Sequence, residues 1–343
     1  MKRNRVKAVL FLLSFCLLFS SCEMKSTEKW KMKFVYPEKT AYCYTPPNLC
    51  GEEIIVSGSE NSSGNPMTTV SVCIETETER DLQFVSLETV ADDTFYYWVD
   101  WEAGYLMKTE KETLKSEQIE RLEQIGRMTE RLSIDGNCLF WLEGTPENEW
   151  GIKKYDLTKQ ESSTVAVSNA VTTPYAKMRV YDGWIVYPKN EEQLTVIVCN
   201  TNTGESQEYE VPLQSMPNEM ITNGEIIAWT SSEGVSYFSL KTKTVTKVEQ
   251  EMLASGIQML KDRYLVYACL GEIYLYDIRD NKVVFETDPN DSIEYLNYFN
   301  TDLEHTRAIF SVSDINAPAP EQQTEFWVPP SYFAILQIEE QRK

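Results

Sequence analysis

The side chains that most often carry out chemistry are scarce in this sequence. Its 343 residues include one histidine, His305, within the polar stretch DLEHTRAIF. A Ser-His-Asp arrangement needs a histidine beside its nucleophile, and we expect His305 to be a surface residue near a loop. The sequence has no G-x-S-x-G, no glycine-rich phosphate loop and no EF-hand spacing. It therefore predicts a protein that is not an enzyme, with no catalytic residue and no cofactor.

The cysteines favour structural roles over metal binding. Cys43 and Cys50 flank the turn-rich segment YTPPNL, and a disulfide between them would close that loop. Four others lie in apolar, strand-like runs and are expected to be small core residues: Cys73, Cys138, Cys199 and Cys269. Because no C-x-x-C motif occurs and the chain has one histidine, we predict no zinc, redox or other metal site.

Two of the eight tryptophans stand apart from the rest. Most tryptophans occupy strand-like positions that recur along the chain, where we expect them to pack in the core. Trp150 and Trp327 lie instead in polar or proline-rich stretches. Exposed aromatic rings are frequent contact residues in binding sites. We therefore take Trp150 and Trp327 as candidate binding residues for a protein or glycan partner.

The N-terminus has the pattern of an export signal. Residues 1–22 read MKRNRVKAVLFLLSFCLLFSSC, a basic start followed by an apolar run and small residues. The apolar run covers residues 8–19, whereas a helix needs about 20 residues to span a bilayer. We therefore predict a signal peptide over residues 1–21 and no transmembrane segment in the mature chain.

Ser20-Ser21-Cys22 resembles the processing site of bacterial lipoproteins. The resemblance implies that Cys22 is diacylated and becomes the first mature residue, anchored in the cell membrane on its extracytoplasmic side. Two acyl chains hold a folded domain durably on a membrane. The Lys-rich stretch EMKSTEKWKMK that follows reads as a tether, so residues 22–51 are expected to hold the anchor, the tether and a possible ring-closing strand.

The charge balance limits the partners. The chain has 53 acidic and 32 basic residues, a formal net charge of −21. Such a charge repels the phosphate backbone of nucleic acids. We therefore exclude nucleic acid as a partner. We read the acidity as a source of solubility, with a cationic partner or divalent cations as the alternative.

A repeated module is the most informative feature of the chain. Four segments each read as apolar strand, tight polar turn, second strand, loop, third strand and second polar turn, over residues 132–160, 178–205, 219–244 and 258–282. Three first turns contain Asp-Gly or Asn-Gly, the strongest short-range signal for a hairpin. Their spacing falls around the 40–45-residue period of four-stranded propeller blades.

Weaker copies extend the repeat in both directions. They cover 53–76 and 94–108 upstream and 293–338 downstream, which makes seven. Residues 30–37 alternate like a strand that could pair with the last copy and close a ring. We therefore predict an all-β fold, a propeller of seven four-stranded blades over residues 52–343. Residues 108–128 are read as an outer strand plus linker. Two β-sandwich domains are the alternative, which the fixed period disfavours.

Tyr97-Trp98-Val99-Asp100, followed by Gly104-Tyr105-Leu106, resembles the signature of YWTD-type propellers, and the arrangement as a whole is similar to TolB-like propellers. The resemblance covers most of residues 52–338 and implies the fold without a ligand. With the export signal, it leads us to expect a cell-envelope lipoprotein whose propeller face binds or scaffolds a protein or peptide partner. The alternative is a carbohydrate-binding or carbohydrate-active envelope protein.

Overall fold

The described part of the chain is built from strands alone. The structure is a computed structural model that describes residues 28–37, 42–60, 66–122, 130–144, 150–168, 179–189, 195–212, 217–248, 254–269, 271–287, 295–313 and 330–338. These residues form 29 strands and include no helix long and apolar enough to cross a membrane. The chain divides into two compact units. One is Met32–Gln337; the other joins Met1–Lys31 with Ile338–Lys343.

The strands form seven antiparallel sheets, numbered here as blades 1–7 in chain order. Blade 1 contains β2 (Tyr42–Cys43) and β3 (Asn48–Cys50), both paired with β4 (Glu53–Ser59), then β5 (Thr68–Cys73) and β6 (Glu79–Asp81). Blade 2 contains β7 (Thr89–Ala91), β8 (Phe95–Asp100), β9 (Tyr105–Glu110) and β10 (Ser116–Arg121). Blade 3 contains β11 (Glu130–Asp135), β12 (Cys138–Gly144), β13 (Trp150–Asp156) and β14 (Glu161–Ser168).

The remaining blades repeat this order. Blade 4 contains β15 (Val180–Tyr181), β16 (Trp184–Pro188), β17 (Thr195–Asn200) and β18 (Ser206–Glu210). Blade 5 contains β19 (Glu219–Thr222), β20 (Ile226–Ser231), β21 (Gly234–Ser239) and β22 (Val245–Lys247). Blade 6 contains β23 (Ala254–Leu260), β24 (Tyr264–Cys269), β25 (Glu272–Asp277) and β26 (Lys282–Glu286). Blade 7 contains β27 (Tyr295–Thr301), β28 (Ala308–Ser313), β29 (Ser331–Ile338) and β1 (Trp30–Val35).

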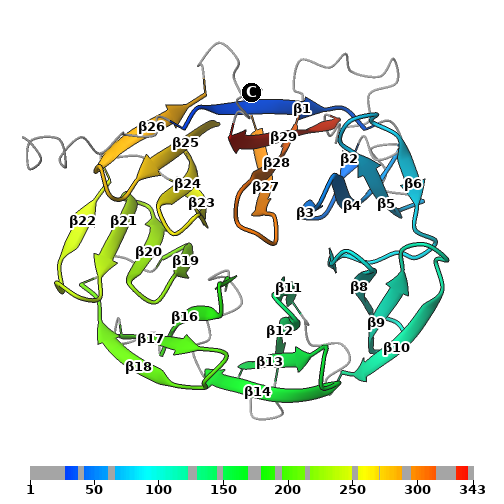
Figure 1. The fold of residues 1–343 in the computed structure, drawn as a ribbon, viewed down its shortest axis with the longest axis horizontal. Helices are drawn as coiled ribbons and strands as arrows, with labels where there is room; N and C mark the ends of the chain where they lie inside the picture. Colours follow the sequence, from blue (N-terminus) through cyan, green and yellow to red (C-terminus); the bar gives the residue numbers. More distant parts are fainter. Residues whose placement is uncertain are drawn as a thin grey trace, which may run out of the picture. The chain divides into compact units, whose positions relative to one another are not determined.

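The innermost strands make a closed circuit. Each contacts its neighbour in the next blade, in the order β3, β7, β11, β15, β19, β23 and β27, and β27 contacts β3 again. The outer strands lie on the rim, as Figure 1 shows. The fold is a seven-bladed β-propeller. The prediction of fold class, repeat and blade number is confirmed, and the alternative of two sandwiches is wrong, because no pair of sandwiched sheets can give this circuit.

Blade 7 is assembled from both ends of the repeat. Its strand order is β1-β29-β28-β27, so the rim strand comes from the N-terminal side of the chain. This is the pairing expected of residues 30–37. The inner edge of blade 1 comes from β2 and β3, which both precede residue 52, so the first blade begins earlier in the chain than the sequence suggested.

The apolar residues are buried between neighbouring blades. One cluster joins blades 2 and 3 around Trp141, which is 2% exposed. Another joins blades 4 and 5 around Trp229, with Trp184 packed against it. Because both faces of a blade are covered, second strands such as β20 and β24 are buried along their whole length and consist mostly of apolar residues. The recurring tryptophans therefore pack between blades, as predicted.

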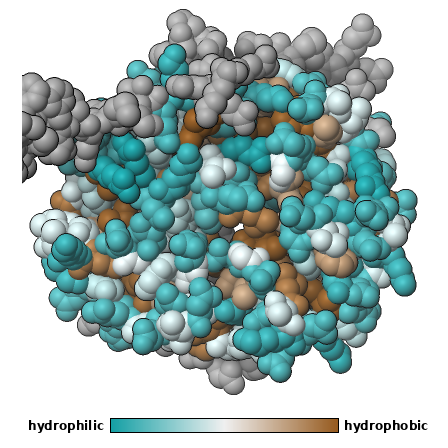
Figure 2. All heavy atoms as spheres, in the orientation of Figure 1, coloured by the Kyte–Doolittle hydropathy of each residue, from teal (hydrophilic) through white to brown (hydrophobic). Residues whose placement is uncertain are grey.

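The hairpin turns and the rim follow their local sequences. Gly224, in the Asn-Gly turn of blade 5, has φ of +82°, a conformation that glycine adopts without strain. In the stretch 108–128, residues 116–121 form the rim strand β10, which confirms the predicted outer strand. Rim strands such as β10 and β18 are mostly exposed, and the face seen in Figure 2 is largely hydrophilic.

Candidate functional site

Polar side chains gather at one end of the propeller axis, where the turns after the innermost strands converge. The turn between β27 and β28, residues Asp302–Arg307, is called the axial turn here. The Asp302 carboxylate, 2% exposed, accepts hydrogen bonds from the backbone N–H groups of Thr306 (2.6 Å) and Arg307 (2.9 Å). It also accepts from Thr306 Oγ1 (2.8 Å) and Arg307 Nε (3.0 Å). The Asp302 carboxylate thus stabilises the conformation of the turn through four hydrogen bonds.

The axial turn carries His305 to the far side of the axis. The imidazole lies on the ring of Tyr181, with centroids 4.2 Å apart. Tyr181 belongs to blade 4 and His305 to blade 7, which are as far apart as a ring of seven allows. The His305 carbonyl accepts a hydrogen bond from Lys261 N in blade 6 (3.0 Å). The expectation of a surface histidine is therefore wrong: His305 is half-buried at the axis.

The environment of His305 favours the neutral imidazole. Burial lowers its pKa below the usual value, although four carboxylates act in the opposite direction: Asp135, Asp302, Asp182 and Asp262. Nδ1 lies 3.2 Å from Thr301 Oγ1. Nε2 is buried and has no hydrogen-bond partner among the described residues. Among the described residues, the side-chain hydroxyl that lies at hydrogen-bond distance from the imidazole is that of Thr301.

A chain of hydrogen bonds crosses the axis beside the axial turn. Arg179 Nη1 in blade 4 donates to Asn300 Oδ1 in blade 7 (3.5 Å). Asn300 Nδ2 donates to Asn48 Oδ1 in blade 1 (2.6 Å), and Asn48 Nδ2 donates to a backbone carbonyl of blade 2 (2.5 Å). Arg179 also lies 3.9 Å from Glu219 of blade 5, which accepts from a backbone N–H of blade 6 (3.0 Å).

This axial network therefore links six of the seven blades. Blade 3 joins blade 4 separately, through the Asp135 carboxylate and the backbone N–H of Gly183 (2.5 Å). The polar groups at the axis are mostly bonded to one another, so the arrangement holds the ring together. What the described residues offer at the axis is hydrogen bonding and charge.

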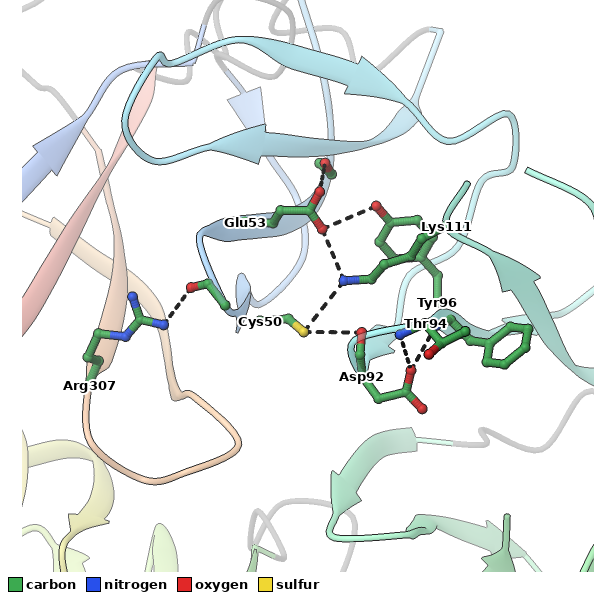
Figure 3. A network of polar contacts seen from close by, with 10 residues as sticks. Cys50, Glu53, Asp92, Thr94, Tyr96, Lys111 and Arg307 are labelled. Carbon is green, nitrogen blue, oxygen red and sulfur yellow. Dashed lines mark hydrogen bonds and ion pairs between the residues drawn. The ribbon is translucent and has the colours of Figure 1, made fainter. Parts of the chain in front are cut away.

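A second polar network, drawn in Figure 3, joins blades 1 and 2. Lys111 Nζ lies 3.1 Å from the Glu53 carboxylate and 3.6 Å from Cys50 Sγ. Tyr96 Oη donates to the same carboxylate (3.3 Å), and the ammonium lies 5.1 Å from the centre of the Tyr96 ring. Cys50 Sγ donates to the Asp92 carbonyl (3.3 Å).

The pKa shifts in this network favour the protonated thiol of Cys50 and the charged amine of Lys111. Burial raises the pKa of the Cys50 thiol, and nearby Lys111 only partly offsets it. Burial lowers the pKa of Lys111, but Cys50 and Glu53 outweigh it and the pKa lies above its usual value. A protonated thiol and a charged amine are both poor nucleophiles. The network therefore has a structural role, which is to hold blades 1 and 2 together.

Arg307 connects the two networks at the junction of blades 7 and 1. Its guanidinium donates to the carbonyl of Gly51 and to Glu52 Oε1 (3.2 Å) while holding Asp302. Figure 3 shows Arg307 reaching toward the turn that carries Cys50. The axial turn is thereby attached to the first blade.

The disulfide predicted between Cys43 and Cys50 is not formed, and both thiols are free. Both residues pair with β4 along one edge, where Cys43 is opposite Gly58 and Cys50 is opposite Glu53. Five residues of strand correspond to about 17 Å, whereas a disulfide requires Cα atoms within about 7 Å. Of the four predicted core cysteines, Cys199 and Cys269 are buried and Cys73 and Cys138 are half-buried.

The other predicted site residues are placed only in part. Cys22 and Trp327 lie outside the described residues, as do most of the long loops. Trp150 is the first residue of β13 and pairs with Gly144 and Ser168, so it belongs to a strand, where the sequence suggested a loop. Sequence reasoning missed Arg179 and Asn300. The feature that could have pointed to them is their position near the end of an innermost strand, where the blades come closest.

Comparison with known proteins adds the fold alone. No family model and no curated protein matches the sequence. The computationally designed Ika8 protein superposes with a TM-score of 0.54 at 13% identity, over 82% of this chain and 97% of that one. PorZ, an essential bacterial surface component of the type-IX secretion system of Porphyromonas gingivalis, also has a TM-score of 0.54, at 12% identity. It is matched over 82% of this chain and 36% of its own length.

Proposed function

We propose that this protein is a non-catalytic, lipid-anchored module of the cell envelope, with a TolB-like or YWTD-type propeller that binds or scaffolds a protein or peptide partner. The observation that carries the proposal is the use of the axial polar groups. Arg179, Asn300 and Asn48 bond to one another across the axis, so these polar side chains serve to hold the ring together. A rigid ring with an exposed rim and two loop-bearing faces is suited to presenting a surface.

The anchor is supported by the leader and by the position of β1. The sequence Ser20-Ser21-Cys22 precedes β1 by eight residues from Cys22 to Trp30. A chain of that length spans at most about 28 Å. Because β1 is the rim strand of blade 7, an acylated Cys22 would hold that part of the rim near the bilayer.

The anchor is tested by metabolic labelling with an alkyne fatty acid in a bacterial host. The wild-type chain should be labelled and sediment with membranes, and Cys22→Ser should be unlabelled and soluble. Cys16→Ser, a change of the same type within the leader, is the matched control and should behave like the wild type. A Cys22→Ser protein that keeps its label would refute the anchor.

The binding role is tested by crosslinking in native membranes. Replacing three loops between strands, residues 60–67, 145–149 and 314–330, with short Gly-Ser turns should remove a crosslinked envelope partner while the melting temperature is retained. If all three variants still crosslink to the same partner, the partner does not bind through the face that carries these loops.

A glycan is the second candidate, and one exposed aromatic cluster favours it. Tyr36, 56% exposed, stacks on Tyr332 with ring centroids 5.3 Å apart, and Phe34 packs edge-on against the same ring. Sugar rings present apolar faces that stack on such side chains. A glycan array on the wild type and on Tyr36→Ser decides between the two: signals lost in the variant establish glycan binding, and a blank array leaves the protein partner.

A further inference from the structure

The seven rim strands differ in how their open edges are protected. A strand at the edge of a sheet presents unpaired backbone N–H and C=O groups, and charged side chains, short length or bulges normally discourage another strand from adding there. Six rim strands are short or carry charges within them: β6 (ERD), β10 (SEQIER), β18 (SQEYE), β22 (VTK), β26 (KVVFE) and β1 (WKMKFV).

β14 of blade 3 is the exception. It reads ESSTVAVS, eight residues, and is the longest of the seven rim strands. Glu161, its first residue, is its only charged residue. The other seven are serine, threonine, valine or alanine, of which the β-branched residues favour extended backbone. Figure 1 shows β14 on the outer rim, as the last strand of its sheet.

The side chains of β14 leave the edge accessible. Residues 161–164 are exposed, and Val167 is 49% exposed. The inner side of β14 pairs with β13 from Asp156↔Glu161 to Trp150↔Ser168, with a bulge that leaves Val165 unpaired. β10 and β26 also have a bulge, so the bulge does not distinguish β14 from other rim strands. The length of β14 and its lack of charged residues distinguish it from the other rim strands.

We propose that β14 is a strand-addition site that accepts an extended, positively charged segment of a partner polypeptide. Another extended backbone matches a row of alternating N–H and C=O groups in register and can replace the water bound there, and serine, threonine and valine side chains leave room for one. The positive charge follows from the surroundings. The chain has a net charge of −21. The rim strands of the two adjacent blades together contain four glutamates and one arginine, Arg121. Two of the glutamates, Glu117 and Glu208, form ion pairs with Lys108 and Lys189, which leaves Glu120 and Glu210 as the further acidic residues of these two strands.

A second copy of this chain fits less well as the occupant. Pairing β14 with itself would place two bodies of net charge −21 side by side, and like charges oppose association. A cationic segment instead gains from the same field. The inference rests on the proposed binding function and names the class of partner. The contact on the rim is made in addition to the contact through the loops.

The test uses the full-length protein in solution and a fluorescent peptide, KTVTVTVK amide, and binding is followed by fluorescence anisotropy. A peptide of the same sequence with N-methylated backbone keeps the charge and loses the donors. The double variant Ser162→Lys/Val167→Lys charges the β14 edge. Ser206→Lys/Gln207→Lys places the same charges on exposed positions of β18 as the matched control.

The wild type should bind the unmodified peptide at least about tenfold more tightly than the N-methylated one, equivalent to 1.4 kcal/mol. The β14 variant should lose the same factor relative to the β18 variant, and peptide should slow hydrogen exchange of β14 amides in the wild type. Equal affinities for the two peptides, or equal losses in the two variants, would overturn strand addition. Concentration-dependent dimers that disappear in the β14 variant would overturn the cationic partner in favour of self-pairing. Labelling of Cys22 and loop-swap crosslinking are independent of all these outcomes.

Discussion

Replacing Asp302 by alanine tests whether the axial turn holds the ring together. Asp302 lies between β27 and β28, and its side chain is 1% exposed. The substitution removes four hydrogen bonds within the turn, two to backbone N–H groups and two to the side chains of Thr306 and Arg307. It also removes the anionic partner of a guanidinium that is itself 15% exposed.

The size of the effect follows from that geometry. A hydrogen bond to a charged group contributes about 1.5–3 kcal/mol, but Arg307 keeps its contacts to Glu52 and Gly51, so the four losses do not add. We expect a decrease of about 3–5 kcal/mol in the free energy of unfolding, as for a buried pair that loses one partner. At about 2 °C per kcal/mol for a large domain, the melting temperature should fall by about 6–10 °C.

Differential scanning calorimetry measures this directly. Asp156→Ala is the matched control, because Asp156 also caps a turn through two backbone N–H groups and pairs with Lys159, but it lies in an outer turn of blade 3. Its melting temperature should stay close to that of the wild type. If Asp302→Ala melts within about 2 °C of the wild type, the axial turn does not support the ring and the argument is wrong.

Three further changes probe the same structure. Gly224→Ala places a Cβ 2.5 Å from an indole of blade 4, at a φ of +82°, and should lower the free energy of unfolding by about 3 kcal/mol. Gly136→Ala, whose Cβ meets nothing within 4 Å, should lower it by about 1 kcal/mol. Urea unfolding of the two variants measures the difference. The depressed pKa of His305 means that the unfolded chain binds the proton first. Stability should fall as pH drops below about 6.5 through the folded pKa, less steeply in His305→Gln, which melting curves against pH will show. Iodoacetamide at pH 8 should label Cys73, whose pKa is lowered by hydrogen bonds, before Cys43, whose pKa burial raises to about 11, and mass spectrometry gives the order.

The repeat was readable from sequence because each blade repeats its own local chemistry. Asn-Gly and Asp-Gly turns fix where a first hairpin bends, and alternating apolar residues mark the strands between them. Residues 108–128, KTEKETLKSEQIERLEQIGRM, are rich in residues that favour helix, and propensity read alone would predict a helix there. In the structure Gln118 and Glu120 of that stretch pair with β9, because sheet pairing overrides a weak helical preference.

The site was less readable because it depends on which residues the closed ring brings together. His305 has a polar sequence neighbourhood, and only the position of Tyr181 three blades away shows that it is an axial residue. The Cys43–Cys50 prediction failed for a related reason. A turn-rich loop suggests that its ends meet, whereas pairing of both ends with one straight strand, β4, holds them apart. Both errors concern contacts that no local pattern encodes.

Many of the polar contacts at the axis lie where the ring closes, between blades 7 and 1. The three C-terminal strands of blade 7 are joined to the N-terminal part of the chain by β1, which pairs with β29 on the rim. On the inner side, the axial turn makes the second attachment: Asn300 bonds to Asn48, Asp302 bridges to Leu49, and Arg307 bonds to Gly51. A ring closed only at the rim could open like a hinge about β1. Attachment at both rim and axis removes that motion, which explains why hydrogen-bonding side chains fill this end of the axis in place of apolar ones, whose contacts do not fix direction.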